Sequence, residues 1–230
     1  MRKQLISLAL LAMMPLAAQA QEEDDSGFNW NAAVTSEYLF RGISQTDDKP
    51  AIQAGAGYSF SNGLYLGGWA SNVEFGDSTD AEVDAFVGWN GDIGESTNLD
   101  VQLVRYDYIG QPSGVDYAYN ELIGKATFVE QYTVTLGYTN DYLNSGENSV
   151  YGAFGGSWDV GWDMSLSAAV GYTSNSGGID DYMDYSVGVS RDFGPVNASL
   201  GYYGTDNSAE DLFGEDNAED KFVLSFSVGG

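Results

Sequence analysis

The feature that most constrains the fold is a period-two alternation of apolar and polar residues that recurs along the chain. It is clearest in the run Ile52–Phe60, where one face carries Ile52, Ala54, Ala56, Tyr58 and Phe60 and the other carries Gln53, Gly55, Gly57 and Ser59. Successive side chains of a β-strand point to opposite faces, so this run predicts a strand with one apolar and one polar side. A tight turn at 61–63 leads into a further run, in which Tyr65, Trp69, Val73 and Phe75 share a face opposite Asn72 and Glu74.

The same alternation predicts twelve strands along the chain, at about 28–41, 52–60, 64–75, 80–90, 98–109, 116–128, 131–141, 149–159, 163–174, 181–193, 196–205 and 221–228. Connections are long and polar after odd strands and mostly short after even strands, with 91–97 as the exception. Long loops at one end and short turns at the other are typical of bacterial membrane barrels. We therefore predict an all-β, transmembrane, antiparallel up-and-down β-barrel of about 12 strands, with ten or fourteen as the alternatives.

Two of these strands have a less regular pattern. Alternation is lost at 104–106, where we expect a β-bulge. Alternation is weak throughout 116–128, so the sequence does not determine which face of that strand points inward.

Aromatic residues support a barrel that faces lipid. They stand near the ends of many apolar faces, as Phe28 and Trp30 do with Tyr38 and Phe40 on the first strand. Girdles at two membrane interfaces produce this distribution. A soluble β-sandwich or lipocalin-like barrel is the alternative, but the second face of nearly every strand here is Gly, Ser, Thr, Asn or Asp. The chain lacks the terminal aromatic residue that assembly machinery commonly reads, so Phe226 serves that purpose or assembly tolerates the tail.

The first residues carry an export signal. A basic start, an apolar run and the small-x-small site Ala18–Ala20 predict a signal peptide over 1–20. A membrane anchor is the alternative, but the apolar run is shorter than the roughly 20 residues that a spanning helix needs. We therefore divide the chain into a signal peptide at 1–20, an acidic leader at 21–27 and a barrel at 28–230.

The opening of the barrel also resembles a known family. The matching residues are SEYLFRGISQT at 36–46, Lys49–Ala51 and WASNV at 69–73. This stretch is similar to the opening of the TorF-like putative porins, a proteobacterial outer-membrane family of uncertain function. The resemblance implies an outer-membrane barrel and says little about the solute.

Composition excludes several functions. The 230 residues carry 34 acidic and 8 basic side chains, a formal net charge of −26 that repels nucleic acid. Cysteine is absent, so thiol chemistry and disulfides are excluded, and histidine is absent, so a Ser-His or Asp-His catalytic site cannot be built. A paired-carboxylate glycosidase remains formally open, although so many carboxylates pair by chance. We predict no enzyme activity and no cofactor.

The predicted lumen is the better candidate site. Seven charged residues on the polar faces are expected to line it: Glu37, Arg41, Glu74, Glu82, Asp84, Asp100 and Asp184. Glu37 and Arg41 stand too far apart on one strand to pair directly, so each is expected to pair with a neighbouring strand. A constriction with net negative charge favours cations. The alternative is that these charges form cross-strand pairs that close a plugged, structural lumen. Twelve strands lie between filled eight-stranded barrels and open porins, so size does not decide.

The acidic stretch 205–220 concentrates hard-cation ligands. It has no calcium-binding spacing, so a solvated outer loop is the ordinary interpretation and bridging of divalent cations to lipopolysaccharide is a minor one. We expect a monomer surrounded by outer-membrane lipid and lipopolysaccharide and inserted by the barrel assembly machinery. The predicted function is a porin for passive diffusion of small polar or cationic solutes. The alternative is a closed structural barrel that displays acidic loops to a partner.

Overall fold

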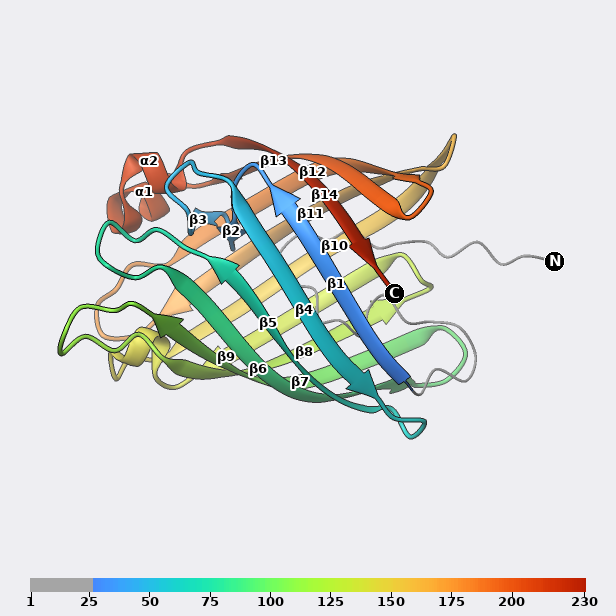
Figure 1. The fold of residues 1–230 in the computed structure, drawn as a ribbon, viewed down its shortest axis with the longest axis horizontal. Coiled ribbons are helices and arrows are strands. Elements are labelled where there is room, and N and C mark those ends of the chain that lie inside the picture. The colour runs from blue at the N-terminus through green and yellow to red at the C-terminus, as the bar shows by residue number, and fades with distance from the viewer. Residues whose placement is uncertain (1–26) are drawn as a thin grey trace.

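Period-two alternation along the chain produces a closed antiparallel barrel of twelve strands. A computed structural model describes residues 27–230 and is shown in Figure 1. The barrel strands are β1 (Gly27–Thr35), β4 (Ala51–Ser59), β5 (Leu64–Asn72), β6 (Ala81–Asp92), β7 (Thr97–Ile109), β8 (Tyr119–Phe128), β9 (Tyr132–Thr139), β10 (Ser149–Gly161), β11 (Met164–Asn175), β12 (Tyr182–Phe193), β13 (Val196–Thr205) and β14 (Lys221–Gly229). Neighbours in sequence are neighbours in the wall, and β1 pairs with β14 to close it. The predicted signal peptide and all but the last residue of the leader lie outside the described residues.

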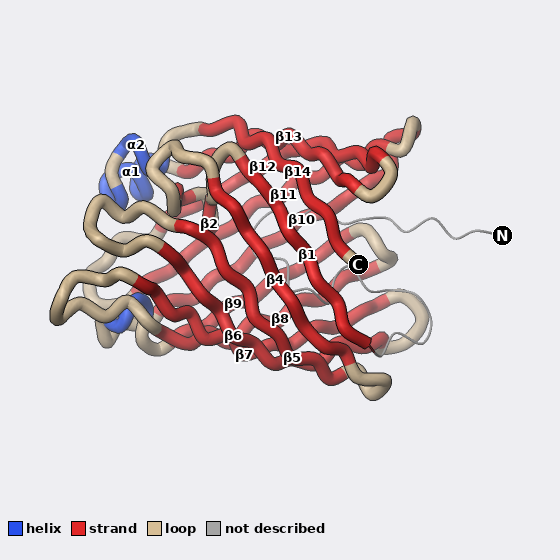
Figure 2. The backbone as a smooth tube through the Cα atoms, viewed as in Figure 1, coloured by secondary structure: helices blue, strands red, loops and turns tan. Residues whose placement is uncertain are grey.

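Loop lengths differ between the two ends of the barrel, as predicted. The longer connections, together with α1 (Asn207–Phe213), α2 (Glu215–Ala218) and the 3₁₀ turn η2 (Tyr142–Asn144), gather at one end, and the short turns at the other (Figure 2). The connection 93–96 is also short, because β6 and β7 extend further than their sequence pattern indicates. The expected exception at 91–97 is therefore removed. Within the described residues, no helix is long and apolar enough to span a membrane, which does not bear on spanning by strands.

The outer surface of the barrel is apolar on strand after strand. Large side chains about half exposed there include Val34, Ile52, Leu66, Val87, Leu103, Leu122, Leu136, Phe154, Val187, Leu200 and Leu224. Exposed aromatic residues near the two rims include Phe28, Phe60, Trp89 and Phe193 at the short-turn end and Tyr138, Tyr172 and Phe222 at the loop end. Soluble monomers rarely expose a continuous apolar surface of this kind. A soluble barrel that turns its apolar face inward is therefore not the fold observed.

Two strands differ from the sequence prediction in the direction of their side chains. In β5, Leu64 and Leu66 point outward while Tyr65 is only 4% exposed, so the face carrying Tyr65, Trp69 and Val73 points inward. β1 ends at Thr35, and the aromatic residue Tyr38 is buried instead of lying in an outer girdle. Both predictions were wrong because side chains packed inside the barrel bury aromatic residues, Tyr38 near the loop end and Tyr65 near the short turns. Apolar character therefore does not by itself mark the outer face.

The expected bulge in the fifth strand was also wrong. The register of β7 with β6 and with β8 runs without a shift through 104–106. Val104 and Tyr106 point inward and are almost completely buried, while Arg105 pairs with Asp107 on the outer face at 3.0 Å. The alternation continues in the backbone, and only the polarity of its two faces is exchanged locally.

The connection from β1 to β4 enters the barrel instead of extending beyond it. Its residues 36–50, here named the lumen hairpin, contain β2 (Leu39–Phe40) and β3 (Ile43–Ser44), which pair around the two-residue turn Arg41-Gly42. Both turn residues have positive φ, 50° and 82°, as in tight hairpin turns of the primed type. A Cβ atom at Gly42 would lie 2.5 Å from Cγ2 of Thr205, so only glycine fits this close approach.

Candidate functional site

The lumen hairpin spans the barrel from one wall to the other. Its ends are held by β1 and β4, where Thr35 and Ala51 are register partners. In a ring of twelve strands β9 stands opposite β1, and the tip of the hairpin reaches β8 and β10 on either side of it. Along the way, the hydroxyl of Tyr38 donates a 3.0 Å hydrogen bond to Glu82 on β6. The hairpin therefore occupies the lumen at this level.

The tip of the hairpin places a guanidinium in a buried carboxylate and aromatic site. Nη2 of Arg41 lies 2.6 Å from Oε1 of Glu121, and the two residues are 6% and 1% exposed. The other carboxylate oxygen of Glu121 accepts a 3.1 Å hydrogen bond from the hydroxyl of Tyr106. Cζ of Arg41 lies 4.2 Å from the ring centroid of Tyr151 on β10 and 4.6 Å from that of Phe40. Both halves of this buried ion pair are therefore satisfied, as a low-dielectric site requires.

The base of the hairpin is held by a second group of charges. Nζ of Lys221, at the start of β14, lies 3.5 Å from Glu37 and 3.5 Å from Glu219, and it also pairs with Asp48. Glu37 and Asp48 belong to the hairpin, and Glu219 belongs to the connection that carries α1 and α2. Ile43 packs against Tyr182 on β12 and against Ala209 and Ala218 of the two helices. The hairpin and this outer connection are thus packed as one unit.

Several carboxylates on the wall have no basic partner. Glu82 and Asp84 are 1% and 5% exposed on the inner face of β6, and neither forms an ion pair within residues 27–230. Glu82 accepts the bond from Tyr38, but Oδ1 of Asp84 has no hydrogen-bond partner among the described atoms. Asp184 on β12 accepts a 3.4 Å bond from Tyr151, and its Oδ2 likewise has none. These three carboxyl groups therefore lack an ion-pair partner at the level of the hairpin.

Nearer the short turns the lumen is lined by hydroxyl and amide groups. Asp100 on β7 is 6% exposed and accepts a 2.8 Å bond from Tyr65 and a 3.3 Å bond from Asn90. Inward hydroxyls at this level include Thr133, Ser157, Ser190, Ser199 and Ser225. This half of the lumen is lined by polar groups together with the packed aromatic side chains of Tyr65 and Phe86.

The structure places the seven predicted lumen residues in three ways. Glu82, Asp84, Asp100 and Asp184 point inward from barrel strands, as predicted. Glu37 and Arg41 also lie in the lumen, but they come from the hairpin and not from a strand. They pair with β14 and β8, so neither pairs with the other.

Glu74 is a correction. β5 ends at Asn72, and Glu74 lies in the outer connection 73–80, where it pairs with the exposed Lys49 at 3.1 Å. The inward assignment took the even-numbered side of this run as the inner face, whereas that side carries Leu64 and Leu66 and points outward. The position of Glu74 at the outer rim excludes it from the wall of the lumen.

Sequence reasoning missed three charged residues of the lumen: Glu121, Lys125 and Lys221. Lys221 and Lys125 point to the inner face, and Lys221 could have been found because it is in phase with the polar face of its strand. Glu121 gave no signal, because Tyr119 and Ile123 share its inner face while Leu122 lies outside. With these included, the charged residues assigned to the lumen are six carboxylates, Glu37, Glu82, Asp84, Asp100, Glu121 and Asp184, and three basic groups, Arg41, Lys125 and Lys221, with Asp48 at the base of the hairpin as a further carboxylate beside Lys221.

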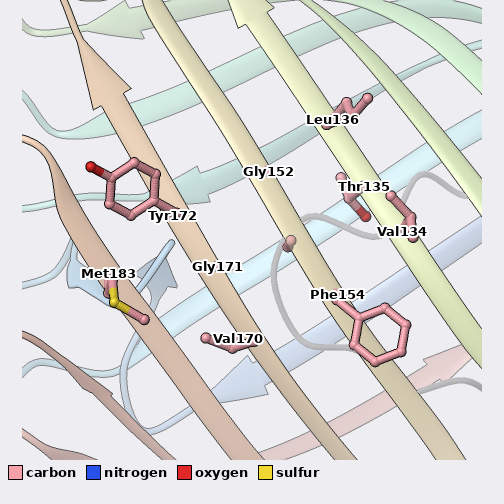
Figure 3. Close-up of a pocket in the computed structure, with 10 residues that line it drawn as sticks. Val134, Thr135, Leu136, Gly152, Phe154, Val170, Gly171, Tyr172 and Met183 are labelled. Atoms are coloured by element: carbon pink, nitrogen blue, oxygen red, sulfur yellow. The ribbon is translucent and has the colours of Figure 1, made fainter.

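A shallow apolar groove lies on the outer wall over β9 to β12 (Figure 3). Leu136, Phe154 and Tyr172 stand around Gly152, whose missing side chain leaves the hollow. The groove lies on the face that carries the apolar belt and has few polar atoms. It is part of that belt and offers no group for chemistry.

Comparisons with known proteins agree with the fold. The NanC porin matches with a TM-score of 0.56 at 8% identity, over 88% of this chain and 98% of that one. The KdgM porin matches with a TM-score of 0.53 at 10% identity, over 87% and 96%, and a KdgM structure in complex with disordered oligogalacturonate matches with 0.52 at 10%, over 88% and 95%. At such identities the likeness shows a shared barrel fold. No curated protein matches the chain. A family model described as "Bacterial protein of unknown function (Gcw_chp)" matches residues 19–227, and the chain belongs to this family.

Proposed function

We propose that this protein is an outer-membrane channel for passive diffusion of small polar solutes, with a preference for cations. The observation that carries the proposal is the combination of an apolar outer belt with a lumen in which carboxylates outnumber basic groups. The fold shared with the KdgM and NanC porins supports it. The sequence resemblance to the TorF-like putative porins supports the same location.

The hairpin sets the constriction in this proposal. A cation entering from the loop end would pass close to Glu82, Asp84 and Asp184, which lie against the hairpin and form no ion pair within the described residues, whereas an anion would be repelled by their carboxylates. Beyond the hairpin it passes hydroxyl and amide groups that can replace water in its hydration shell. Diffusion through such a path makes and breaks no covalent bond, and no catalytic step is proposed.

The proposed setting follows from the outer surface. The apolar belt would lie in the hydrocarbon of the outer membrane, with the aromatic residues of the two rims at its interfaces. Lipid and lipopolysaccharide would be its neighbours, and insertion would require the barrel assembly machinery. The acidic connection 206–220 would then face the outside of the cell.

A closed structural barrel is the second candidate. It is favoured by one observation, which is that the hairpin tip is buried and its Arg41 forms an ion pair with Glu121 at the opposite wall. On this hypothesis the lumen is permanently filled, and the acidic loops are the functional surface.

Electrical recording separates the two candidates. The refolded chain is inserted into a planar bilayer, and the reversal potential is measured under a KCl gradient. The channel proposal predicts stable current steps with a cation-selective reversal potential that moves toward zero in Glu82→Gln and Asp84→Asn. Asp107→Asn is the matched control, because it removes one carboxylate from the outer face of β7 and should leave selectivity unchanged.

A barrel that inserts with β-rich circular dichroism and passes no current would refute the channel and leave the structural candidate. An anion-selective current would contradict the role given to the acidic lumen.

A further inference from the structure

The guanidinium of Arg41, at the tip of the lumen hairpin, is a cation of a kind that a small solute can also carry. Arg41 belongs to the lumen hairpin, as does Phe40 beside it, while the groups that the guanidinium contacts on the far wall are Glu121 on β8, Gly137 on β9 and Tyr151 on β10. A Cβ atom at Gly137 would lie 2.7 Å from Oε1 of Glu121 and 2.9 Å from Nη2 of Arg41. Glycine therefore leaves the space in which the guanidinium sits against the backbone of β9.

The surroundings suit a planar, delocalised cation better than a compact one. The guanidinium lies over the Tyr151 ring at 4.2 Å while one of its nitrogens contacts the carboxylate at 2.6 Å. Guanidinium stacks on aromatic faces and is more weakly hydrated than ammonium, so it loses less on entering such a site. Tyr106 and Tyr151 are held in turn by bonds to Glu121 and Asp184. The wall residues are thus positioned by contacts that do not involve Arg41 alone.

The hairpin that delivers Arg41 is short. Its two strands pair over only two residues each. Its tip residue holds a φ of 50°, in the left-handed region that a residue with a side chain adopts at some cost. A cation that occupies the wall site from solution would replace the contact that fixes this tip.

We propose that the far wall of the lumen is a binding site for guanidinium-bearing solutes, occupied in this structure by Arg41 as a built-in ligand. Such a solute competes with Arg41 for Glu121 and Tyr151, and its binding releases the hairpin tip. The solute class and the link to hairpin release rest on the proposed channel function, whereas the existence of the site does not.

The test is rescue of an Arg41→Ala barrel by methylguanidinium. The variant is folded in detergent micelles, and its thermal unfolding midpoint is followed by tryptophan fluorescence as methylguanidinium chloride is added, with NaCl matching the ionic strength. We expect a saturable rise in the midpoint. In Arg41→Ala/Glu121→Gln, which keeps the shape of the wall but not its charge, half-saturation should need about tenfold more methylguanidinium. Methylammonium should also bind more weakly than methylguanidinium.

An Arg41→Ala barrel that shows no saturable rise would overturn the site, as would an equal rise with and without the Glu121 charge. If Arg41→Ala does not fold alone, its folding yield with methylguanidinium present gives the same answer, and Arg41→Gln repeats the test with a longer side chain. The readout needs no current. A barrel that is rescued but carries no current would refute the proposed channel and retain the site.

Discussion

At the scale of single residues, the inner charges of this barrel fall into paired and unpaired groups. Arg41 and Glu121 are buried and satisfy each other, while Asp84 and Asp184 each keep a carboxylate oxygen without a partner. Removing one partner of a buried pair leaves an uncompensated charge, which costs more than the pair itself contributes. Stability should therefore depend on Arg41 and Glu121 jointly, and ion selectivity on the unpaired carboxylates.

A double-mutant cycle tests the joint dependence. Arg41→Gln and Glu121→Gln should each lower the free energy of unfolding by about 3 kcal/mol, while the double variant should lose clearly less than the sum of the two. Urea unfolding in micelles, followed by tryptophan fluorescence, measures the three differences. The exposed pair of Lys49 and Glu74 is the matched control and should show no coupling. Additive losses at Arg41 and Glu121 would show that their contact contributes nothing.

Residue positions were predictable where the two faces of a strand differ in polarity. Glu82 and Asp84 could be placed because Val83, Ala85 and Val87 mark the opposite face of β6. Glu121 could not, because β8 has apolar residues on both faces where its inner side packs against Tyr106 and Tyr142. The partners of Arg41 and Glu37 were beyond sequence reasoning, since they depend on a connection crossing the lumen.

At the scale of elements, eleven of the twelve barrel strands were predicted near their observed bounds, and the first was predicted too long. Residues 36–41 continue the alternation of β1, but β1 ends at Thr35 and Ser36 begins the inward path. Alternation indicates only that successive side chains lie in two different environments. A hairpin packed inside a barrel has two such environments, as a strand of the barrel wall does. The pattern alone therefore does not distinguish a wall strand from a hairpin inside the lumen.

The outer connections also contain ordered elements of their own. Asp181, just before β12, accepts hydrogen bonds from the backbone N–H of Asn175 and from the hydroxyls of Tyr172 and Ser174. These bonds favour the charged form and hold the pKa of Asp181 below its ordinary value of 3.8. The carboxylate thereby fixes the connection between β11 and β12.

A pH effect follows from the sign of this shift. Because the folded-state pKa is depressed, the stabilisation is fully present above the ordinary aspartate pKa and is lost as the pH falls through the lower folded value. The connection 176–181 should therefore stay protected at neutral pH and loosen only in strong acid. An NMR titration of the carboxyl carbons checks this, with Asp180 as the neighbouring reference. A midpoint for Asp181 at or above 3.8 would contradict it.

At the scale of the whole molecule, the barrel wall has an apolar outer face and a polar inner face, and the lumen hairpin fills part of the interior. In the proposed channel, the apolar belt would hold the barrel in the membrane and the excess of carboxylates would favour cations. The hairpin of residues 36–50 would set the width of the path, because it connects adjacent strands and reaches the opposite side of the ring. Conductance should thus be governed by this one connection more than by the strand number.

The geometry allows the hairpin to be removed while β1 and β4 stay joined in register. Thr35 and Ala51 are register partners, so a two-residue Asn-Gly turn can join β1 to β4 in place of residues 36–50. Shortening the exposed connection 112–115 by the same kind of turn is the control, because the hairpin makes no hydrogen bond or ion pair there.

The most direct measurement is the single-channel conductance of the shortened barrel beside that of the intact chain, in the same bilayer and salt. We expect the conductance to be several-fold larger when residues 36–50 are replaced and to be unchanged in the control. Equal conductance in the intact and the shortened barrel would contradict it, because the lumen hairpin would then not be what limits the path.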